Sequence, residues 1–575
     1  MNQSSPGNGA GRVWIDPAPL PPDLPALHHD QLIHDILARR LEDPATAADF
    51  LDASPRPAPD PHRFPGMSEA VARVAAALRR DDPIGIFGDY DTDGVTSAAI
   101  LTLGLRAASG GSNPRAVRLP RRPEGYGLSL AGVDDLADAG VTLLIAVDCG
   151  SKDHDGVARA RARGLDVVIL DHHRLTEAPP EGVILASAQV RDDAPYRELS
   201  AAGIAYLLVT ALAQAGFDSG DGIGTEPRSL LDLAMIGLIG DVSRLTGVNR
   251  PLVRDGLRAL RTGSRVGLRA LCESGRIDWS GLSSSDVAFL ISPRLNAPGR
   301  MGDPRPAYEM LVSQDYGDAA RLAAAIELAN RQRREMQDRI ITEVDALLAA
   351  DPAPLTRRVL VLAGEGWEPG IVGLAAGKLA ERYDRPVIVL ATDGAEARGS
   401  ARSVPGIDIT SALGEASSLL IRHGGHERAA GLSVPHASIA ELAEALEATI
   451  DRSDAPLPGP SRLPIDAELP EARLRLDVAG LVQSLGPFGE GHPIPSLRVS
   501  NIPIRGYSVM GREHQHLKIL TSGQAGIVDA ILWNGAARSR ELLGARSVDM
   551  VGALEINTWN GSRRAQFKIS DFRVS

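Results

Sequence analysis

The chain has 575 residues and a formal net charge of −12 at pH 7. This length exceeds what a single hydrophobic core supports, so two to four domains are expected. The negative charge argues against a protein that coats nucleic acid indiscriminately. No apolar run approaches the roughly 20 residues that span a membrane, and no secretory signal is recognisable. Cys149 and Cys272 are too few for a disulfide framework or a thiolate zinc site, so a cytoplasmic location is expected.

The N-terminal part, residues 1–66, predicts a tail, two short helices and a connector. The first 20 or so residues look like a disordered tail. Residues 27–54 combine helical apolar spacing with capping residues, and residues 54–66 are rich in proline.

A regular α/β pattern begins near Met67 and extends over residues 67–310. The apolar strands “PIGIFG”, “VTLLIAVD” and “LDVVILD” alternate with helical segments. This alternation is typical of a parallel, doubly wound sheet. Residues 311–350 are amphipathic and highly charged, and they predict a long connecting helix.

A second α/β domain is predicted for residues 351–455, starting with the strand in “RRVLVLAGEG”. The proline-rich stretch “SDAPLPGPSRLP” marks its end. Residues 456–575 contain short strands of alternating polarity, such as “HQHLKIL”, and favour a small all-β barrel.

Four segments deliver carboxylates or imidazoles at the ends of apolar segments. Strands end in “GDYDTDG”, “VDCG” and “DHHR”, and an apolar helix leads into a fourth aspartate motif, “GDVSR”. In open α/β sheets, ligands bind beyond the carboxyl ends of the strands, so we expect these groups to converge. The candidates are Asp89, Asp91, Asp93, Asp148, His172, His173 and Asp241.

This ligand set suits manganese or magnesium, because both prefer oxygen ligands and accept one or two imidazoles. Five aspartates and a histidine are too many ligands for one cation. We therefore expect two cations that share one carboxylate. Two such ions about 3.5–4 Å apart orient a phosphate and activate a water molecule. The pattern therefore predicts phosphodiester hydrolysis.

Each motif alone has an ordinary structural explanation. “DYDTDG” is as often a polar turn or a fragment of a calcium loop, Asp241 alone is more often a helix cap, and “DHH” can be a surface turn. Their joint occurrence, each at the end of an apolar segment, favours the metal site.

The four segments “GDYDTDGVTS”, “VDCGS”, “DHHR” and “GDVSRLTGVNR” resemble, in this order, the motifs of the DHH phosphoesterase superfamily. “SPRLNAPGRMGDPRPAYEML”, “RGSARSVPG”, “HGGHERAAGL” and “LGPFGEGHPIP” extend the similarity to the single-strand-specific DNA exonucleases of that superfamily, from about Leu27 to the C-terminus. The resemblance implies a DHH domain, a long helix, a DHH-associated domain and an OB-fold, with the DNA strand between the first two lobes.

The resemblance also implies roles for the candidates. Two divalent ions, Mn²⁺ or Mg²⁺, would be held by Asp89, Asp91, Asp93, Asp148, His172 and Asp241, with Asp148 as the bridge. His173 would lie near the scissile phosphate and donate a hydrogen bond or a proton, so the catalytic set is His173, Asp93 and Asp148.

Further segments offer phosphate ligands. “LPRRPEGYG” contains two arginines, and its spacing does not decide which contacts phosphate. “SPRLNAPGR” reads as a loop that clamps phosphate, although a surface salt-bridge loop explains it equally simply. “GSARS” reads as a small-residue loop, and “HGGHE” permits close backbone approach. The candidates are Arg121, Arg122, Arg294, Asn296, Arg300, Ser400, Arg402, Gly424, Gly425 and His426.

The sequence thus predicts a metal-dependent exonuclease that removes nucleotides from the 5′ end of single-stranded DNA in repair and recombination. The resemblance supplies the polarity and the DNA preference, and it suggests a helicase and a single-strand-binding protein as partners. Two alternatives stay open: a DHH phosphodiesterase for short oligonucleotides or cyclic dinucleotides, and an inactive DNA-binding scaffold. The β-barrel argues against the first, and the complete metal motifs argue against the second.

Overall fold

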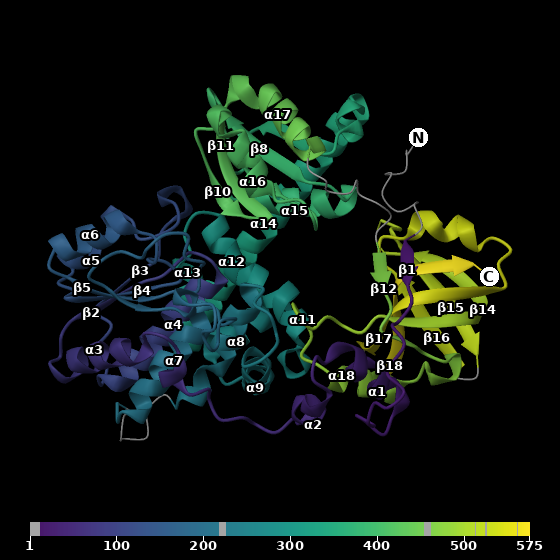
Figure 1. The fold of residues 1–575 in the computed structure, drawn as a ribbon, viewed down its shortest axis with the longest axis horizontal. Helices are drawn as coiled ribbons and strands as arrows, with labels where there is room; N and C mark the ends of the chain where they lie inside the picture. The colour runs from purple at the N-terminus through teal and green to yellow at the C-terminus, as the bar shows by residue number, and fades with distance from the viewer. Residues whose placement is uncertain are drawn as a thin grey trace. The chain divides into compact units, whose positions relative to one another are not determined.

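The structure is a computed structural model that describes residues 12–217, 226–452, 462–511, 513–523, 526–559 and 562–574. The chain divides into two compact units, and their helices and strands are labelled in Figure 1. The core unit comprises Ser54–Gln337 and Pro487–Pro493, and the flanking unit comprises Met1–Ala53, Asp338–Gly486 and Ile494–Ser575.

A five-stranded, entirely parallel sheet forms the centre of the core unit. Its strand order is β3-β2-β4-β5-β6, with β2, β4 and β5 in the interior. The interior strands read as continuous apolar runs because both faces of the sheet are covered. The strands are β2 (Ile84–Phe87), β3 (Ala116–Arg118), β4 (Leu143–Val147), β5 (Asp166–Leu170) and β6 (Ile184–Ala186).

Alternate strand residues enter two separate hydrophobic clusters, one on each face of the sheet. Leu144 and Ala146 pack with α5 (Leu130–Asp138) and α6 (His154–Ala162). Ile145 and Val147 pack on the opposite face, where the covering helices are α3 (Met67–Arg79), α4 (Thr92–Ala108), α7 (Ala201–Gln214) and α8 (Leu231–Gly240). Figure 1 shows the two helical layers on opposite sides of the strands.

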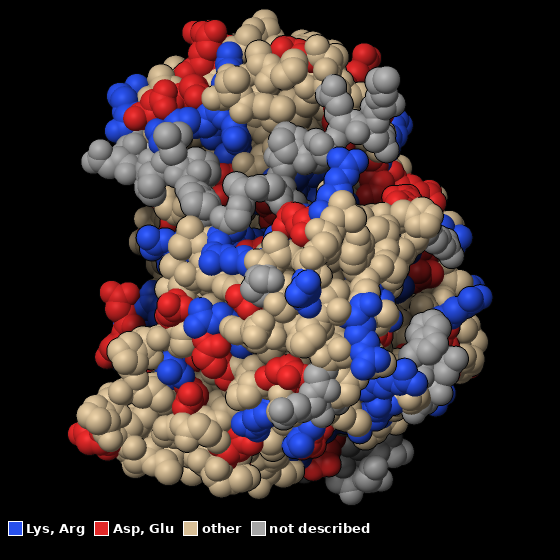
Figure 2. All heavy atoms as spheres, turned by 90° about the vertical axis from the view of Figure 1, so that its right-hand side faces the viewer, with Lys and Arg blue, Asp and Glu red and all other residues tan. Residues whose placement is uncertain are grey.

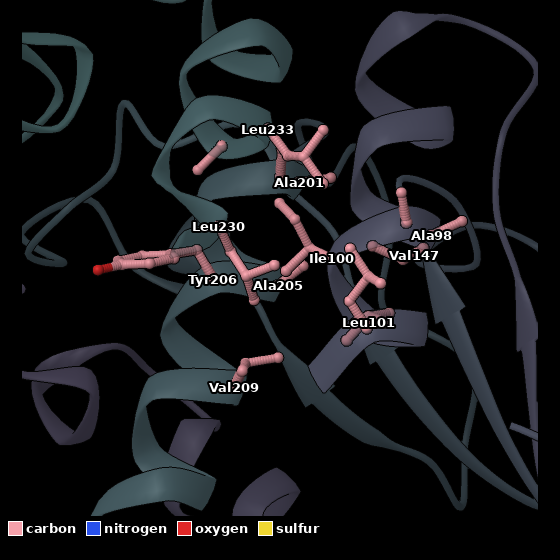
Figure 3. Packing of buried hydrophobic residues seen from close by; sticks show 14 of the residues in the cluster. Ala98, Ile100, Leu101, Val147, Ala201, Ala205, Tyr206, Val209, Leu230 and Leu233 are labelled. Carbon is pink, nitrogen blue, oxygen red and sulfur yellow. The ribbon is translucent and has the colours of Figure 1, made fainter. Parts of the chain in front are cut away.

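Helices α4, α7 and α8 pack against one another in the largest cluster. Figure 3 shows Ile100 and Leu101 of α4 beside Ala205 of α7 and Leu233 of α8. Gly237 of α8 is the point of closest approach: a Cβ atom there would lie 2.3 Å from Ala202 Cβ and 2.7 Å from Asp93 Oδ1. The packing therefore requires glycine at residue 237.

The remainder of the core unit is helical. It contains α9 (Asn249–Arg261), α10 (Val266–Gly275), α11 (Ser284–Asp286), a π-helical turn (Val287–Ile291), α12 (Ser292–Arg300) and α13 (Arg305–Val312). The long helix α14 (Tyr316–Ala350) follows and confirms the predicted connecting helix.

The α/β part of the flanking unit is a five-stranded mixed sheet with strand order β10-β11-β9-β8-β7. Its strands are β7 (Leu360–Glu365), β8 (Val387–Asp393), β9 (Glu396–Arg402), β10 (Arg422–His426) and β11 (Ala429–Pro435). Its helices are α15 (Val372–Tyr383), α16 (Ile409–Glu415) and α17 (Ile439–Arg452). Only β7 and β8 pair in parallel.

The C-terminal part is a closed β-barrel, because β14 pairs with both β15 and β17. Phe567 and Phe572 lie in its interior, and Trp533 is half-exposed. The barrel comprises β13 (Ala467–Glu468), β14 (Leu497–Met510), β15 (His516–Gly523), β16 (Gly526–Leu532), β17 (Ser547–Trp559) and β18 (Ser562–Val574), with α18 (Leu476–Ser484) before β14.

The predicted fold class is confirmed, whereas the local predictions for residues 13–15, for residues 292–300 and for the loop “GSARS”, which lies mainly in β9, are wrong. Val13–Ile15, predicted within a disordered tail, form β1, which pairs with β12 (Arg462–Pro464), and Trp14 Nε1 donates to Asp571 at 2.7 Å. Residues 292–300, predicted as a loop, form α12, because Pro293 suits the first helical turn and burial of Leu295 outweighs local propensity.

Two further expectations fall on residues that the structure does not describe. Residues 1–11 of the predicted tail and residues 453–461 of the predicted boundary lie outside the described ranges. Within the described ranges, no helix is both long enough and apolar enough to cross a membrane.

The close packing at Gly237 generates a prediction. Gly237→Ala should lower the free energy of unfolding by about 1–3 kcal/mol, because the added methyl group overlaps Ala202 and the Asp93 carboxylate. Gly480→Ala in α18 is the matched control: open space surrounds that residue, so alanine should stabilise by about 0.5–1 kcal/mol. Hydrogen exchange of peptides from α8 and α18 measures both changes. Equal protection of α8 in wild type and Gly237→Ala would contradict the prediction.

Candidate metal centre

The carboxyl edge of the parallel sheet gathers acidic residues, among them Asp171, which was not among the predicted site residues. Asp89 follows β2, Asp148 follows β4, and Asp171 follows β5. Asp148 has a φ of 64°, a left-handed conformation that aspartate tolerates better than most residues. Asp241 is the C-cap residue of α8. Because parallel strands end at the same edge, residues far apart in sequence meet there.

Asp91 shapes the turn between β2 and α4. It is the N-cap of α4, and its side chain accepts hydrogen bonds from the backbone N–H groups of Asp93 and Gly94. A Cβ atom on Gly94 would lie 2.6 Å from the backbone nitrogen and oxygen of Asp89. The glycine of “DYDTDG” thus lets the chain fold back closely enough to bring Asp89 beside Asp91.

Three overlapping groups of side chains have ligand atoms within 4.8 Å of one another. His172 Nε2 lies 3.2 Å from Asp148 Oδ1, and its Nδ1 lies 3.7 Å from Asp241 Oδ2. Asp148 and His172 each belong to two groups, so adjacent groups share a side chain. The groups are Asp89, Asp91 and Asp148; Asp93, His172 and Asp241; and Asp148, His172 and His173.

Three carboxylates of this cluster, those of Asp89, Asp93 and Asp148, are buried, and their ionised forms are correspondingly costly. Burial and the neighbouring Asp91 raise the pKa of Asp89 well above its usual value. Burial and the charges of Asp93, Asp91 and Asp89 do the same to the pKa of Asp148. Burial and Asp241 raise the pKa of Asp93 to about 7. These carboxylates resist joint ionisation unless cations compensate their charge.

Two oxygen atoms in the cluster lack hydrogen-bond partners. Asp89 Oδ1 and Asp148 Oδ1 are buried and accept no hydrogen bond from the described residues. Buried carboxylate oxygens are normally satisfied, so unpartnered ones require an explanation. Divalent cations that prefer oxygen ligands explain both the unpartnered oxygens and the raised pKa values. The residues present therefore fit such ions.

Asp93 has a second, structural function. Its Oδ1 accepts hydrogen bonds from Ser200 Oγ (2.8 Å) and Ala202 N (3.0 Å), and its Oδ2 accepts one from Ala201 N (2.8 Å). These donors begin α7, whose N-terminus favours a negative charge. Asp93 thereby fixes α4 to α7 beside the metal centre.

His173 is held by groups that the sequence analysis did not place in the site. Its Nδ1 lies 2.8 Å from Asp171 Oδ1, and Asp171 also accepts from the Ser151 hydroxyl. Burial alone would raise the pKa of Asp171, but the hydrogen bond and charge of His173 hold it below its usual value. Tyr126 Oη donates to the Asp148 carbonyl (3.0 Å) and lies 3.1 Å from His173 Nδ1. The strand-end position of Asp171 was a signal that could have revealed it.

The predicted phosphate ligands of the core unit differ in their burial and in their partners. The Arg122 guanidinium stacks 4.7 Å from the centre of the Tyr90 ring, next to Asp89, whereas the exposed Arg121 lies 3.9 Å from Asp303. The buried Arg294 donates to Glu327 (2.7 Å) and to the Leu290 carbonyl.

Asn296 and Arg300 both belong to α12. Asn296 Oδ1 accepts from Thr92 N (2.8 Å), so this amide holds the first turn of α4. Arg294 therefore has partners within the protein for its guanidinium, and Asn296 has one for its amide oxygen. Arg300 is half-buried.

In the flanking unit, the segment “GSARS”, predicted as a loop, lies mainly within strand β9. Its Gly399 allows β9 to approach β8 closely, since a Cβ atom at this residue would lie 2.3 Å from the Val389 carbonyl oxygen. The register places the candidates in two cross-strand rows, with the row that contains Gly425 between them. One row contains Ser400, Gly431 and Gly424, and the other contains Arg402, Ala429 and His426. Gly425 has a φ of 154° on β10, between Gly424 and His426.

Arg402 is the most unusual of these residues. Burial lowers the pKa of its guanidinium, which donates to the Ala401 carbonyl (2.9 Å). No carboxylate pairs with it among the described residues. A Cβ on Gly373, in the first turn of α15, would lie 3.0 Å from Ser400 Oγ and 3.2 Å from Arg402 Nη2. A guanidinium, a hydroxyl and a helix N-terminus thus surround one position, which is a combination that suits an anion.

Comparison with known proteins agrees with this architecture. Three family models match: the DHH family, N-terminal domain, over residues 83–238; the DHHA1 domain over 356–452; and the RecJ OB domain over 465–571. The single-stranded-DNA-specific exonuclease RecJ of Bacillus subtilis is 32% identical over 96% of this chain and 69% of its own length. The protein of the same name from Escherichia coli is 30% identical over 88% and 90%.

A crystal structure of RecJ from Thermus thermophilus in complex with Mn²⁺ has a TM-score of 0.79 to this chain, at 28% identity, covering 98% of this chain and 80% of the other. A second structure of the same protein, in complex with Mg²⁺, has a TM-score of 0.73 at 27% identity, covering 98% and 78%. The identity and the coverage of full-length relatives, together with the shared domain order, establish that the chain belongs to the RecJ family of DHH exonucleases.

Proposed function

We propose that the chain is a metal-dependent exonuclease that removes nucleotides from the 5′ end of single-stranded DNA in repair and recombination. The observation that carries the proposal is the buried cluster in which Asp148 joins two groups of ligand atoms and keeps one oxygen unpartnered. Family membership supports the substrate class, and the closed barrel supplies a second binding domain that a small cyclic substrate would not need.

Two divalent cations, Mn²⁺ or Mg²⁺, would be held by Asp89, Asp91, Asp93, Asp148, His172 and Asp241. When bound, they would supply Lewis-acid activation of water and neutralise charge on the phosphate. His173 has a separate role. Because Asp171 and Tyr126 engage its Nδ1, its Nε2 is the nitrogen available to hydrogen-bond a substrate oxygen or to transfer a proton.

The surface charge agrees with selective rather than general binding. The face drawn in Figure 2 carries Lys and Arg interspersed with Asp and Glu. We also propose a cytoplasmic location, and a helicase and a single-strand-binding protein as partners, on the family resemblance alone.

The decisive experiment is digestion of end-labelled single- and double-stranded DNA and RNA with Mn²⁺, Mg²⁺ or chelator. Release of mononucleotides from the 5′ end of single-stranded DNA, dependent on metal, is the expected result. Cleavage of dinucleotides alone would favour the phosphodiesterase alternative, and binding without cleavage would favour the scaffold.

Asp148→Asn should lower the exonuclease rate by more than about 100-fold, because it removes the charge that two ligand groups share. Without metal at pH 8, the variant should have a higher melting temperature than wild type, since a buried carboxylate with a raised pKa opposes folding when ionised. The control is Asp155→Asn, an exposed carboxylate in α6. Calorimetric Mn²⁺ titration and thermal unfolding test both parts, and undiminished Mn²⁺ stoichiometry in Asp148→Asn would refute the assignment.

The affinity for Mn²⁺ should rise with pH. Burial and Asp241 raise the pKa of Asp93 to about 7, so this side chain is protonated below pH 7 and must release its proton to bind a cation. Each displaced proton changes the apparent dissociation constant about tenfold per pH unit below the pKa of its group. Because the pKa values of Asp89 and Asp148 are also raised, titrations from pH 5.5 to 8.5 should show the constant falling by at least about tenfold per pH unit below pH 7. Constant affinity across this range would show that Asp93 does not bind the ion.

Arg402→Ala should slow cleavage of 5′-phosphorylated strands at least about tenfold and of 5′-hydroxyl strands much less, because the guanidinium has no carboxylate partner and can pair with a terminal phosphate. Arg402→Lys should rescue little, since lysine cannot make the forked contact. The control is Arg382→Ala. Arg382 lies in α15, nine residues after Gly373, and the substitution removes its ion pair with Asp345. If the ratio of rates on the two end types does not change, Arg402 does not read the end, and Arg121 and Arg122 become the candidates.

A further inference from the structure

A cavity of about 280 Å³ lies beside the metal centre within the core unit. It shares His172 and Asp241 with that centre, so any group bound in it lies next to the reacting phosphate. Its other polar walls come from the segment after β5, the segment before α7 and the turn after α8. They are Arg174, Gln189, Arg197, Glu198, Ser243 and Arg244.

The turn after α8 is held rigidly. Ser243 N donates to the Leu238 carbonyl and Val242 N to the Ile239 carbonyl, the two bonds of a Schellman C-cap. Ser243 Oγ donates to Asp241 Oδ2 (2.9 Å). Beyond the turn, Leu245 N donates to the Glu490 carbonyl (2.8 Å), and Asn249 Nδ2 donates to the Arg244 carbonyl (2.9 Å). The backbone that carries Arg244 is thus fixed relative to Asp241.

Val242 occupies the position of this motif at which glycine is usual. Its φ is 59°, which is costly for a β-branched residue, and 66% of the side chain is exposed. A glycine would relieve the strain, so the fold alone does not explain a valine here. Strained residues gather at functional sites. The side chain offers an apolar surface beside the arginines, which suits the sugar or base of a nucleotide.

The arginines of this cavity are available to an anion. Arg174 and Arg244 are exposed, and among the described residues neither forms an ion pair or a side-chain hydrogen bond. Arg197 pairs with Asp192, whose side chain is fully exposed, and such a pair contributes little to stability. The three guanidinium groups outnumber the two carboxylates of the cavity, Glu198 and Asp241. They favour phosphate, because a guanidinium matches the oxygens of a phosphate in a forked arrangement.

We infer that this cavity binds the phosphodiester that follows the scissile one on its 3′ side. The inference rests on the proposed function, in which the terminal phosphate contacts Arg402 and the strand continues from the metal centre toward its 3′ end. The phosphodiester next to the scissile one must then contact a surface whose residues also belong to the metal centre. The cavity that includes His172 and Asp241 meets this requirement and brings the positive charge that a phosphodiester needs.

A single neutral linkage tests the inference. The substrate is a 5′-phosphorylated single strand with a methylphosphonate at the second linkage from the 5′ end, compared with the unmodified strand. In wild type, neutralising this linkage should lower kcat/KM for release of the first nucleotide about tenfold, because its charge-assisted hydrogen bonds to the arginines become weaker. In Arg174→Ala and Arg244→Ala the ratio should fall toward one, since the partner of that charge is already absent.

Arg106→Ala is the matched control. Arg106 is an exposed arginine of α4, thirteen residues from Asp93, which places it about 20 Å along the helix from the metal centre. It should keep the wild-type ratio. The inference would be overturned if the ratio of kcat/KM for the unmodified and the methylphosphonate strand stayed at the wild-type value in both cavity variants. It would also be overturned if these variants changed only the preference for 5′-phosphate over 5′-hydroxyl ends.

Binding gives a readout that does not depend on catalysis. In an Asp148→Asn background, Arg174→Ala or Arg244→Ala should make the slope of log Kd against log salt concentration shallower by about 0.7 for each phosphate that no longer has an arginine partner. An unchanged slope would overturn the inference. Weaker thermal protection by inorganic phosphate in these variants, with unchanged DNA binding, would also overturn it and assign the cavity to free phosphate. If wild type does not cleave the unmodified strand, the proposed function fails, whereas the salt slope still decides whether the cavity binds the strand.

Discussion

The burial of several carboxylates at one edge of the parallel sheet is the constraint on which the rest of the structure depends. Asp89, Asp93 and Asp148 are each at most 5% exposed, and burial raises the pKa of all three. Such a cluster opposes folding when it is ionised and uncompensated. The surrounding fold must therefore be stable enough to hold it, and divalent cations must supply the missing charge.

The core unit meets this requirement by close helix packing. Asp93 joins α4 to the N-terminus of α7, and Gly237 lets α8 approach both helices. The segment Pro487–Pro493, although distant in sequence, packs with the core unit. Its Glu490 carbonyl accepts from Leu245, just beyond Asp241, and its Phe488 exchanges two hydrogen bonds with Ser284. The backbone around the fourth acidic motif is thus fixed by residues that follow the DHHA1 domain in the chain.

The net negative charge of the chain weakens general attraction to nucleic acid, whereas particular arginines attract phosphate locally. The chain is acidic overall, and both signs are interspersed on the face in Figure 2. Arginines without acidic partners among the described residues occur beside the metal centre, at Arg174 and Arg244, and in the DHHA1 sheet, at Arg402. Many other surface arginines are paired with nearby carboxylates, as Arg159 and Arg163 are with Asp134.

Local patterns in the chain were enough to predict the fold class and the four acidic motifs. Apolar strands covered on both faces, and aspartates at strand ends, leave signatures that neighbouring residues reveal. The folded chain was needed to identify the partners of these residues: Asp171, Ser151 and Tyr126 around His173, Glu327 against the buried Arg294, and the cavity that Arg174 and Arg244 line. It was also needed to show that residues 13–15 form a strand and residues 292–300 a helix. Periodicity reports which face of an element is buried, whereas hydrogen-bond partners and strand pairing depend on segments that are distant in sequence.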